Sequence, residues 1–216
     1  MLRLLSPSLK RFLISTLCVF LCLVTFYINV ETTMAESRIN VLSSGVRSEF
    51  PKGIHFWITV EGKYEISKIT VRFQILGERS QRYDNLVIDQ GPRTHGELLI
   101  RVDTPQRYIP PGATIRYHFE IQDSTGIDFR TDPKEFVLLD PRFAWESISG
   151  SHASILYYGA NKELAQLVLN DAQTTLEIMG NLIDTTVAQT LVLTMYNNTN
   201  DMKPALPSRS KLQEQK

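Results

Sequence analysis

The sequence predicts a mainly β protein, with an antiparallel β-sandwich of the immunoglobulin or fibronectin kind followed by a small, incomplete α+β unit. Two observations predict this fold class. Apolar and polar residues alternate over 38–139, as in strands with one buried and one wet face. After Pro141 the period lengthens to that of an amphipathic helix. We expect a signal peptide or membrane anchor over 1–35, the sandwich over 36–140, the α+β unit over 141–200 and a polar tail over 201–216.

Residues 1–35 show the order of features found in an export signal. A basic lead-in precedes residues 12–30, of which 15 of 19 are apolar, and Thr33-Met34-Ala35 offers small residues for a cleavage site. The run is also long enough to cross a bilayer, which takes roughly 17–25 residues. Both a cleaved signal and an uncleaved anchor place the remainder outside the cytoplasm, because the basic end stays inside. We therefore expect an exported protein, either secreted or anchored by a single span.

The composition of the exported part excludes several classes of protein. Residues 36–216 carry 20 basic and 22 acidic residues, a net charge of −2. Nucleic-acid binding needs clustered positive charge, so we expect no nucleic-acid partner. Both cysteines, Cys18 and Cys22, lie in the apolar run, which leaves the exported part without a disulfide or a Cys-based zinc site.

Short strand signals separated by turn signals fill the first domain. The expected strands cover 39–42, 54–60, 69–75, 86–89, 97–102, 115–121, 129 and 136–139. The expected turns lie at 51–53, 61–63, 91–92, 110–112 and 123–126, where Pro fixes φ and Gly accepts positive φ. Many short strands without a helical stretch indicate a sandwich, and the missing Cys pair argues against an antibody-type domain.

The second unit begins with two strand candidates, 143–148 and 153–158, and ends with a third over 190–196. Between them a helix is expected from the N-cap Asn161 to a stop at Gly180. Its buried face is expected to carry Leu164, Leu167, Val168, Ala172, Leu176 and Met179. Three strands and one helix form a small core, and the helix face has few partners, so the unit is interpreted as cut short.

No residue pattern in the chain supports catalysis or metal binding. The four histidines, His55, His95, His118 and His152, are too far apart in sequence for a helical zinc pair, and His55 and His118 are interpreted as surface residues. Residues 149–152 (SGSH) read as a loop without an orienting carboxylate. Residues 123–128 read as a hairpin turn, because a calcium loop would need further ligands. We predict no catalytic, cofactor-binding or metal-binding residue, and no cofactor.

Six short sequence segments, taken in order, resemble those of a known protein family. They are EFP at 49–51, ITVRF at 69–73, PPGATIRYHFEI at 110–121, DSTG at 123–126, DPRFAW at 140–145 and LVLTMY at 191–196. Together they resemble exported bacterial proteins in which a peptidase-MA-like, thermolysin-type zinc metallopeptidase domain follows an N-terminal β-sandwich. The resemblance implies chemistry based on a His-Glu-x-x-His motif in a later helix. This chain contains no such motif, so no site residue is carried over, and it is expected to be the front part of such a protein.

Two functional hypotheses follow. The first is a non-catalytic, exported or membrane-tethered protein, a sandwich joined to a truncated metallopeptidase-like domain without its active-site motif. The alternative is a stand-alone extracytoplasmic binding or adhesion module. An enzyme with an unrecognised site is disfavoured, because no acid, base and nucleophile converge. The expected partner is an unidentified protein or cell-envelope component, with membrane contact through residues 12–30 if the signal is uncleaved.

Overall fold

The computed structural model describes residues 39–185 and 189–207. The chain divides into two units between Ser37 and Arg38, close to the predicted end of the N-terminal segment. The predicted signal or anchor over 1–35 lies outside the described residues. Among the helices that the structure describes, none is long and apolar enough to span a bilayer.

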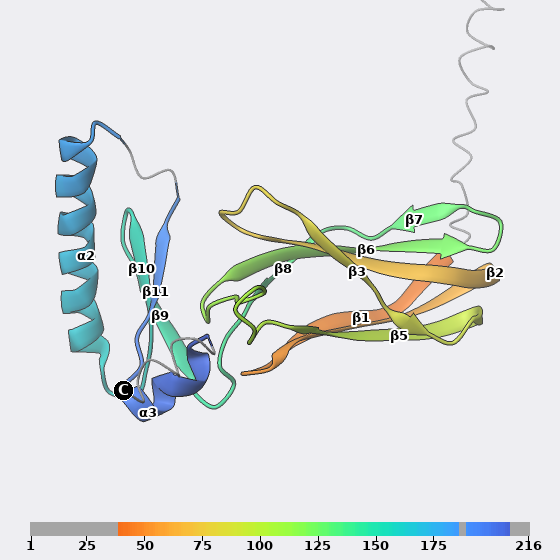
Figure 1. The fold of residues 1–216 in the computed structure, drawn as a ribbon, viewed down its shortest axis with the longest axis horizontal. Coiled ribbons are helices and arrows are strands. Elements are labelled where there is room, and N and C mark those ends of the chain that lie inside the picture. Colours follow the sequence, from red (N-terminus) through yellow and green to blue (C-terminus); the bar gives the residue numbers. More distant parts are fainter. Residues whose placement is uncertain (1–38, 186–188, 208–216) are drawn as a thin grey trace, which may run out of the picture. The chain divides into compact units, whose positions relative to one another are not determined.

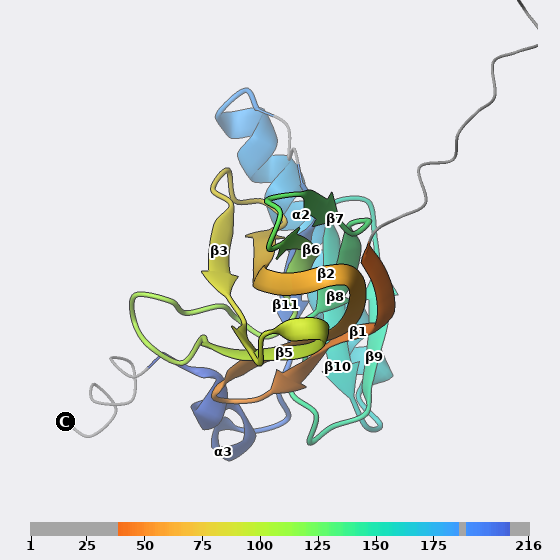
Figure 2. The same cartoon turned by 90° about the vertical axis from the view of Figure 1, so that its right-hand side faces the viewer.

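Eight antiparallel strands form one sheet that folds back on itself. They are β1 (Ile39–Glu49), β2 (Gly53–Ile75), β3 (Arg82–Asn85), β4 (Val87–Ile88), β5 (Gly91–Arg101), β6 (Thr114–Asp123), β7 (Asp128–Arg130) and β8 (Lys134–Val137). The first part of β2 pairs with β1 and β5, and its last part pairs with β3 and β6, so β2 belongs to both layers (Figures 1 and 2). The predicted mainly β fold, an antiparallel sandwich followed by a small α+β unit, is confirmed.

The main core lies between the two layers, which we call the first half-sheet (β1, β5, β4 and the start of β2) and the second half-sheet (β3, β6, β7, β8 and the end of β2). Alternate residues over 54–60 of β2 are completely buried, and the Phe56 ring lies 5.3 Å from that of Tyr117 and 6.5 Å from that of Phe119. Full burial of such a side chain stabilises the fold by about 1.5–3 kcal/mol. This core anchors the positions of the outward-facing residues between the buried ones.

Two of the predicted turns are strand in the structure. Gly62, in the predicted turn 61–63, pairs with Ile39, and β2 runs on through it. The register of β2 against β5 shifts between Glu61 and Ile66, where the strand passes from one layer to the other. The polar composition there therefore marks an exposed bend. The predicted turn at 91–92 is the start of β5, a position where the missing N–H of a proline is tolerated.

The second unit is a mixed three-stranded sheet covered by a helix. Its strands are β9 (Trp145–Ser149), β10 (Ala153–Tyr158) and β11 (Leu191–Thr194), with β9 antiparallel and β11 parallel to β10. The helix α2 (Lys162–Leu182) lies along one face of these strands (Figure 1). A second core joins them, consisting of Ala153, Ile155, Tyr157, Ala165 and Leu169. The sandwich and this α+β unit both belong to the compact part Arg38–Lys216, although each has its own core.

The helix buries a face rotated from the predicted one. Three of the six predicted residues pack against the second core, but Leu164, Leu167 and Met179 are exposed. The buried centre consists of Ala165 and Leu169 instead. A three-stranded sheet is narrow and covers one stripe of a helix, so an apolar pattern wider than that stripe leaves some residues outside.

The helix ends also differ in part from the prediction. Asn161 is the N-cap residue, but its side chain makes no capping bond and donates to the carbonyl of Tyr158. The helix passes Gly180 and ends at Leu182, after which Asp184 takes a positive φ of 49°.

Only the start of the predicted polar tail over 201–216 is described, because residues 208–216 lie outside the described residues. Its first residues are folded into the end of α3 (Thr199–Met202) and the short helix η1 (Lys203–Ala205). Ala205 is buried, and the Tyr108 hydroxyl donates to its carbonyl at 2.8 Å. The overlooked signal is the N-cap Asn198, whose side chain accepts from the backbone N–H of Asp201 at 3.0 Å.

Candidate functional site

The outer face of the first half-sheet carries Trp57 at its centre. Phe56 and Ile58 point into the core, so the alternation of β2 directs Trp57 outward. Its cross-strand neighbours are Gly45 of β1 and Glu97 of β5. Strands therefore flank this position on both sides, and it lies in the middle of the layer.

The Trp57 indole lies flat against the sheet. A Cβ placed on Gly45 would be 2.1 Å from ring atom Cζ2 and 2.6 Å from each of its two ring neighbours, Cε2 and Cη2. Equal distances to both neighbours place that point over the ring face, because a point beyond the ring edge would lie much farther from them. One indole face thus covers the bare backbone of Gly45. The opposite face is directed away from the sheet, where Trp57 is partly exposed and the Arg47 guanidinium lies over part of its ring.

Polar side chains flank the indole on the same face, together with exposed Leu99, the cross-strand neighbour of His55. The His55 ring lies 5.8 Å from the Trp57 ring at an interplanar angle of 25°, and the Arg47 guanidinium carbon lies 5.7 Å from the indole centroid. His95 is hydrogen-bonded to the Thr59 hydroxyl at 3.0 Å. We call the surface formed by Arg47, His55, Trp57, Thr59, His95 and Glu97 the Trp57 face.

The charged side chains of the Trp57 face, Arg47 and Glu97, each have a polar partner close by. Arg47 donates to Glu49 at 2.6 Å, and this hydrogen bond lowers the pKa of the Glu49 carboxyl. His55 Nε2 lies 3.3 Å from a carboxylate oxygen of Glu97. The side chains of Arg47 and Glu97 remain 59% and 62% exposed. The face therefore offers both donors and acceptors to a ligand.

The four histidines do not come together. His55 and His95 lie on the Trp57 face, His118 lies on the second half-sheet, and His152 follows β9. The surface interpretation of His118 is wrong, because only 8% of the residue is exposed. Its cross-strand neighbour is Arg72, and long side chains of this kind cover the residues beside them. Within residues 39–185 and 189–207, no group of three or more His, Cys, Asp or Glu side chains is arranged to hold a metal ion.

An ion-pair network covers the outer face of the second half-sheet. Glu120 accepts from Arg72 at 2.6 Å and from Arg130 at 2.7 Å. Partial burial alone would raise the pKa of Glu120, but the two guanidinium hydrogen bonds outweigh it and lower the pKa to about 2. Burial, aided by the charge of Arg130, lowers the pKa of His118. Because the carboxylate is occupied by two arginines, this network is a structural feature of the sheet.

Two loops noted in the sequence have local roles. The segment 149–152 connects β9 to β10, and beside it the Ser149 hydroxyl is hydrogen-bonded across the strands to that of Ser154 at 2.9 Å. The segment 123–128 forms the turn between β6 and β7, in which Asp123 accepts from the N–H groups of Thr125 and Ile127. This is the local bonding expected of an Asp-led turn.

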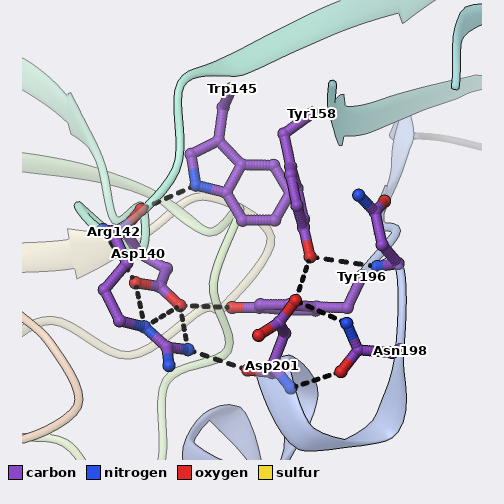
Figure 3. Close-up of polar contacts among 8 residues, drawn as sticks. Asp140, Arg142, Trp145, Tyr158, Tyr196, Asn198 and Asp201 are labelled. Atoms are coloured by element: carbon purple, nitrogen blue, oxygen red, sulfur yellow. Dashed lines mark hydrogen bonds and ion pairs between the residues drawn. The ribbon is translucent and has the colours of Figure 1, made fainter. Parts of the chain in front are cut away.

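Residues of the segment 140–145 (DPRFAW) form a polar and aromatic cluster around the completely buried Asp140 (Figure 3). Arg142 donates to its carboxylate through two nitrogens, with a shortest distance of 2.6 Å, and the Tyr196 hydroxyl donates to the same group at 3.3 Å. The Trp145 indole donates to the Asp140 carbonyl at 2.7 Å. Burial and the adjacent Asp140 raise the pKa of Tyr196.

A second acid extends this cluster towards α3. The Tyr158 hydroxyl donates to the Asp201 carboxylate at 2.8 Å, and Arg142 donates to the Asp201 carbonyl at 2.8 Å (Figure 3). The Phe143 ring stacks on that of Tyr158 at 4.1 Å. The cluster fastens β9, β10 and the segment after β11 to one another, and its polar groups are used in doing so.

An apolar groove of about 760 Å³ lies beside this cluster, lined by residues of 75–77, 108–114, 189–196, 202, 205 and 206. The Thr194 hydroxyl donates to the carbonyl of Pro111 at 2.8 Å, and the Tyr108 hydroxyl bonds to Ala205. These polar side chains of its wall therefore hold β11 and η1 in place. The Trp57 face, in contrast, presents exposed polar groups around an aromatic surface.

In the expected strand 54–60, the alternation of apolar and polar residues places Trp57 on the same outward face as His55, which is interpreted as a surface residue. This alternation does not identify the flat platform, which depends on Gly45. Gly45 and Trp57 are twelve positions apart, and only the antiparallel register of β1 and β2 makes them neighbours. A glycine within a strand signals close backbone approach, but which ring approaches it cannot be read before the register is known.

Comparisons with known proteins leave the family open. No protein-family model matches the chain, and no curated protein matches it. Among solved structures, the chain is similar to one described as "Crystal structure of Br derivative BhCBM56", at 11% sequence identity and a TM-score of 0.30. The similarity covers 44% of this chain and 88% of that one. A likeness of this extent carries no functional argument.

Proposed function

We propose that this chain is a non-catalytic, exported binding module and that the Trp57 face is its binding surface. The single observation that supports this function is the geometry of the indole, which rests on Gly45 with one face and turns the other outward. Aromatic residues and arginine are enriched at binding surfaces, because a rigid ring supplies a large contact area at little entropic cost. The predicted export signal makes a cell-envelope component the partner.

The relationship to peptidase-MA-like proteins stays a prediction. The sequence contains no His-Glu-x-x-His motif, so no catalytic role is assigned to any of its residues. The binding function does not depend on that relationship, because the Trp57 face belongs wholly to the sandwich.

Co-sedimentation with isolated bacterial envelopes tests the function. The full-length chain, kept in mild detergent, should sediment with envelope fragments, and Trp57→Ala should weaken this binding by about thirtyfold, the loss typical of a central aromatic residue. Tyr83→Ala is the matched control. Tyr83 is also an exposed aromatic residue, with the Arg72 guanidinium 5.3 Å from its ring, but it lies on the second half-sheet. Equal binding by the two variants, both folded by circular dichroism, would refute the function.

A further inference from the structure

We infer that the ligand of the Trp57 face is a neutral polysaccharide, bound with a pyranose ring stacked on the partly exposed outer face of the indole. This inference rests on the proposed function and names the chemical class of its ligand. Three properties of the face support it: the flat ring, the paired charges and the absence of free backbone groups beneath the ligand. The first matches the shape of a sugar ring, and the other two argue against an anionic polymer and against a peptide that joins the sheet as a strand.

The flat indole matches the shape of a sugar ring. A pyranose has two broad faces covered by C–H groups and a rim of hydroxyl groups. Stacking one such face on the indole removes apolar surface of both partners from water. Because Gly45 holds the ring parallel to the sheet, the contact is preorganised, and little rotamer entropy is lost on binding.

The groups beside the indole match the rim of that ring. A hydroxyl is both a donor and an acceptor, so it bonds equally well to a guanidinium or a carboxylate. Exposed Arg47 supplies donors and exposed Glu97 supplies acceptors on the same face, and His95 with Thr59 adds a further polar pair. A ligand with only hydrogen-bond donors would leave Arg47 without a partner, and a ligand with only acceptors would leave Glu97 without one.

The paired charges favour a neutral ligand over an anionic one. Arg47 is bonded to Glu49, and His55 lies beside Glu97. Arg101, farther along β5, is likewise bonded to Asp103 at 2.7 Å. An anionic polymer would have to compete with these carboxylates for each cation, whereas a neutral sugar leaves the pairs intact.

The position of Trp57 within the sheet argues against an extended peptide. A peptide that joins a sheet as a strand needs a free edge with unpaired N–H and C=O groups. β2 is paired with β1 through Gly45 and with β5 through Glu97 on either side of Trp57, so a peptide strand could be added only at the outer edges of β1 or β5, beyond the strands that flank the indole. Recognition at this face therefore depends on side chains, which suits a ligand whose hydrogen-bonding groups lie around a ring.

The test uses envelopes in which either carbohydrate or protein has been destroyed. Periodate cleaves the vicinal diols of sugars, and a protease removes proteins. The full-length chain should lose its Trp57-dependent sedimentation with periodate-treated envelopes and retain it with protease-treated ones. Soluble neutral glucans, mannans, xylans and galactans serve as competitors, with polygalacturonate as the anionic comparison, and at least one neutral polymer should displace the chain.

Three substitutions distinguish a stacking platform from a merely apolar contact. Trp57→Phe keeps a flat ring and should retain measurable binding, whereas Trp57→Leu and Trp57→Ala should weaken binding to the competing neutral polymer by about thirtyfold. Tyr83→Ala should bind as the unchanged chain does.

The outcomes separate the two levels of the proposal. If binding depends on Trp57 but survives periodate and is lost with protease, the ligand is a protein, and the polysaccharide inference is wrong while the binding function stands. Displacement by polygalacturonate alone, or by no polysaccharide at all, also overturns the inference. If Trp57→Ala binds envelopes as well as Tyr83→Ala does, the binding function itself fails.

Discussion

The contact between Trp57 and Gly45 determines whether the Trp57 face is flat. Gly45→Ala should displace the indole without removing it, because the added Cβ would meet the ring face at 2.1 Å. We expect a loss of about 1–3 kcal/mol in the free energy of unfolding, the usual result of overpacking, together with weaker envelope binding. Urea denaturation and co-sedimentation measure the two effects.

Gly91→Ala is the control for this substitution. Gly91 also lies in the first half-sheet, but a Cβ there would have its nearest contact at 3.6 Å, with the carbonyl oxygen of Arg93. This variant should keep both stability and binding. If Gly45→Ala behaved like Gly91→Ala, the indole would not depend on the bare backbone of Gly45.

Asp140 and Arg142 form the second residue-scale prediction. Arg142→Met leaves a completely buried carboxylate without the guanidinium that bonds it at 2.6 Å. Breaking such a pair by removing one partner costs about 3–5 kcal/mol, which urea denaturation would detect. The double variant Asp140→Asn/Arg142→Met removes the stranded charge and should recover part of the loss. A loss below about 1 kcal/mol for the single variant would mean that the pair behaves like an exposed one.

The helix α2 shows why elements are easier to predict than their orientation. The spacing of its apolar residues predicts that the helix exists, and the N-cap residue Asn161 predicts where it begins. Its buried face depends on which stripe meets the three strands, and Leu164 and Leu167 remain exposed although they fit the apolar period. The strand β2 shows the same limit, because Gly62 and its polar neighbours resemble a turn until the two layers are known.

A pair of leucines tests the packing of α2. Leu169→Ala removes a side chain that is 3% exposed in the second core and should cost about 2–5 kcal/mol. Leu167→Ala changes a side chain that is 61% exposed and should stay within about 0.5 kcal/mol of the unchanged chain. Unfolding in urea, followed by far-ultraviolet circular dichroism, compares them. Similar losses would show that the buried face of the helix has been assigned incorrectly.

Stability of the whole molecule should fall on acidification in two stages. The folded state lowers the pKa of His118, so the unfolded chain binds a proton more readily, and stability declines as pH drops below about 6.5. The lowered pKa of Glu120 contributes stability above its unfolded value, and this contribution is lost as pH falls from about 4.5 towards 2.

Two substitutions separate these stages in thermal unfolding measured from pH 8 to pH 2. His118→Asn should flatten the decline around pH 6.5, and Glu120→Gln should flatten the decline below pH 4.5. Unchanged pH profiles in both variants would mean that other groups govern the acid sensitivity.

At the scale of the molecule, the sequence was sufficient for the fold class but not for the geometry of the Trp57 face. Alternation identifies which side chains of β2 face outward, and Trp57 was placed correctly by it. The surface exists because β1 brings Gly45 beneath the indole and β5 brings Glu97 beside it. Those neighbours are set by strand pairing over long sequence separations, which local patterns do not encode.

The most direct test of the binding surface uses the two tryptophans of the chain, Trp57 and Trp145. Each gives one indole N–H signal in a ¹⁵N-resolved NMR spectrum of the full-length chain in detergent, and Trp145 is an internal control because its N–H is bonded to Asp140. On titration with glycans released from bacterial envelopes, the Trp57 signal should shift to saturation while the Trp145 signal stays in place. A shift of Trp145 alone, or no shift of Trp57 in a preparation that binds envelopes, would contradict the assignment of the Trp57 face as the binding surface.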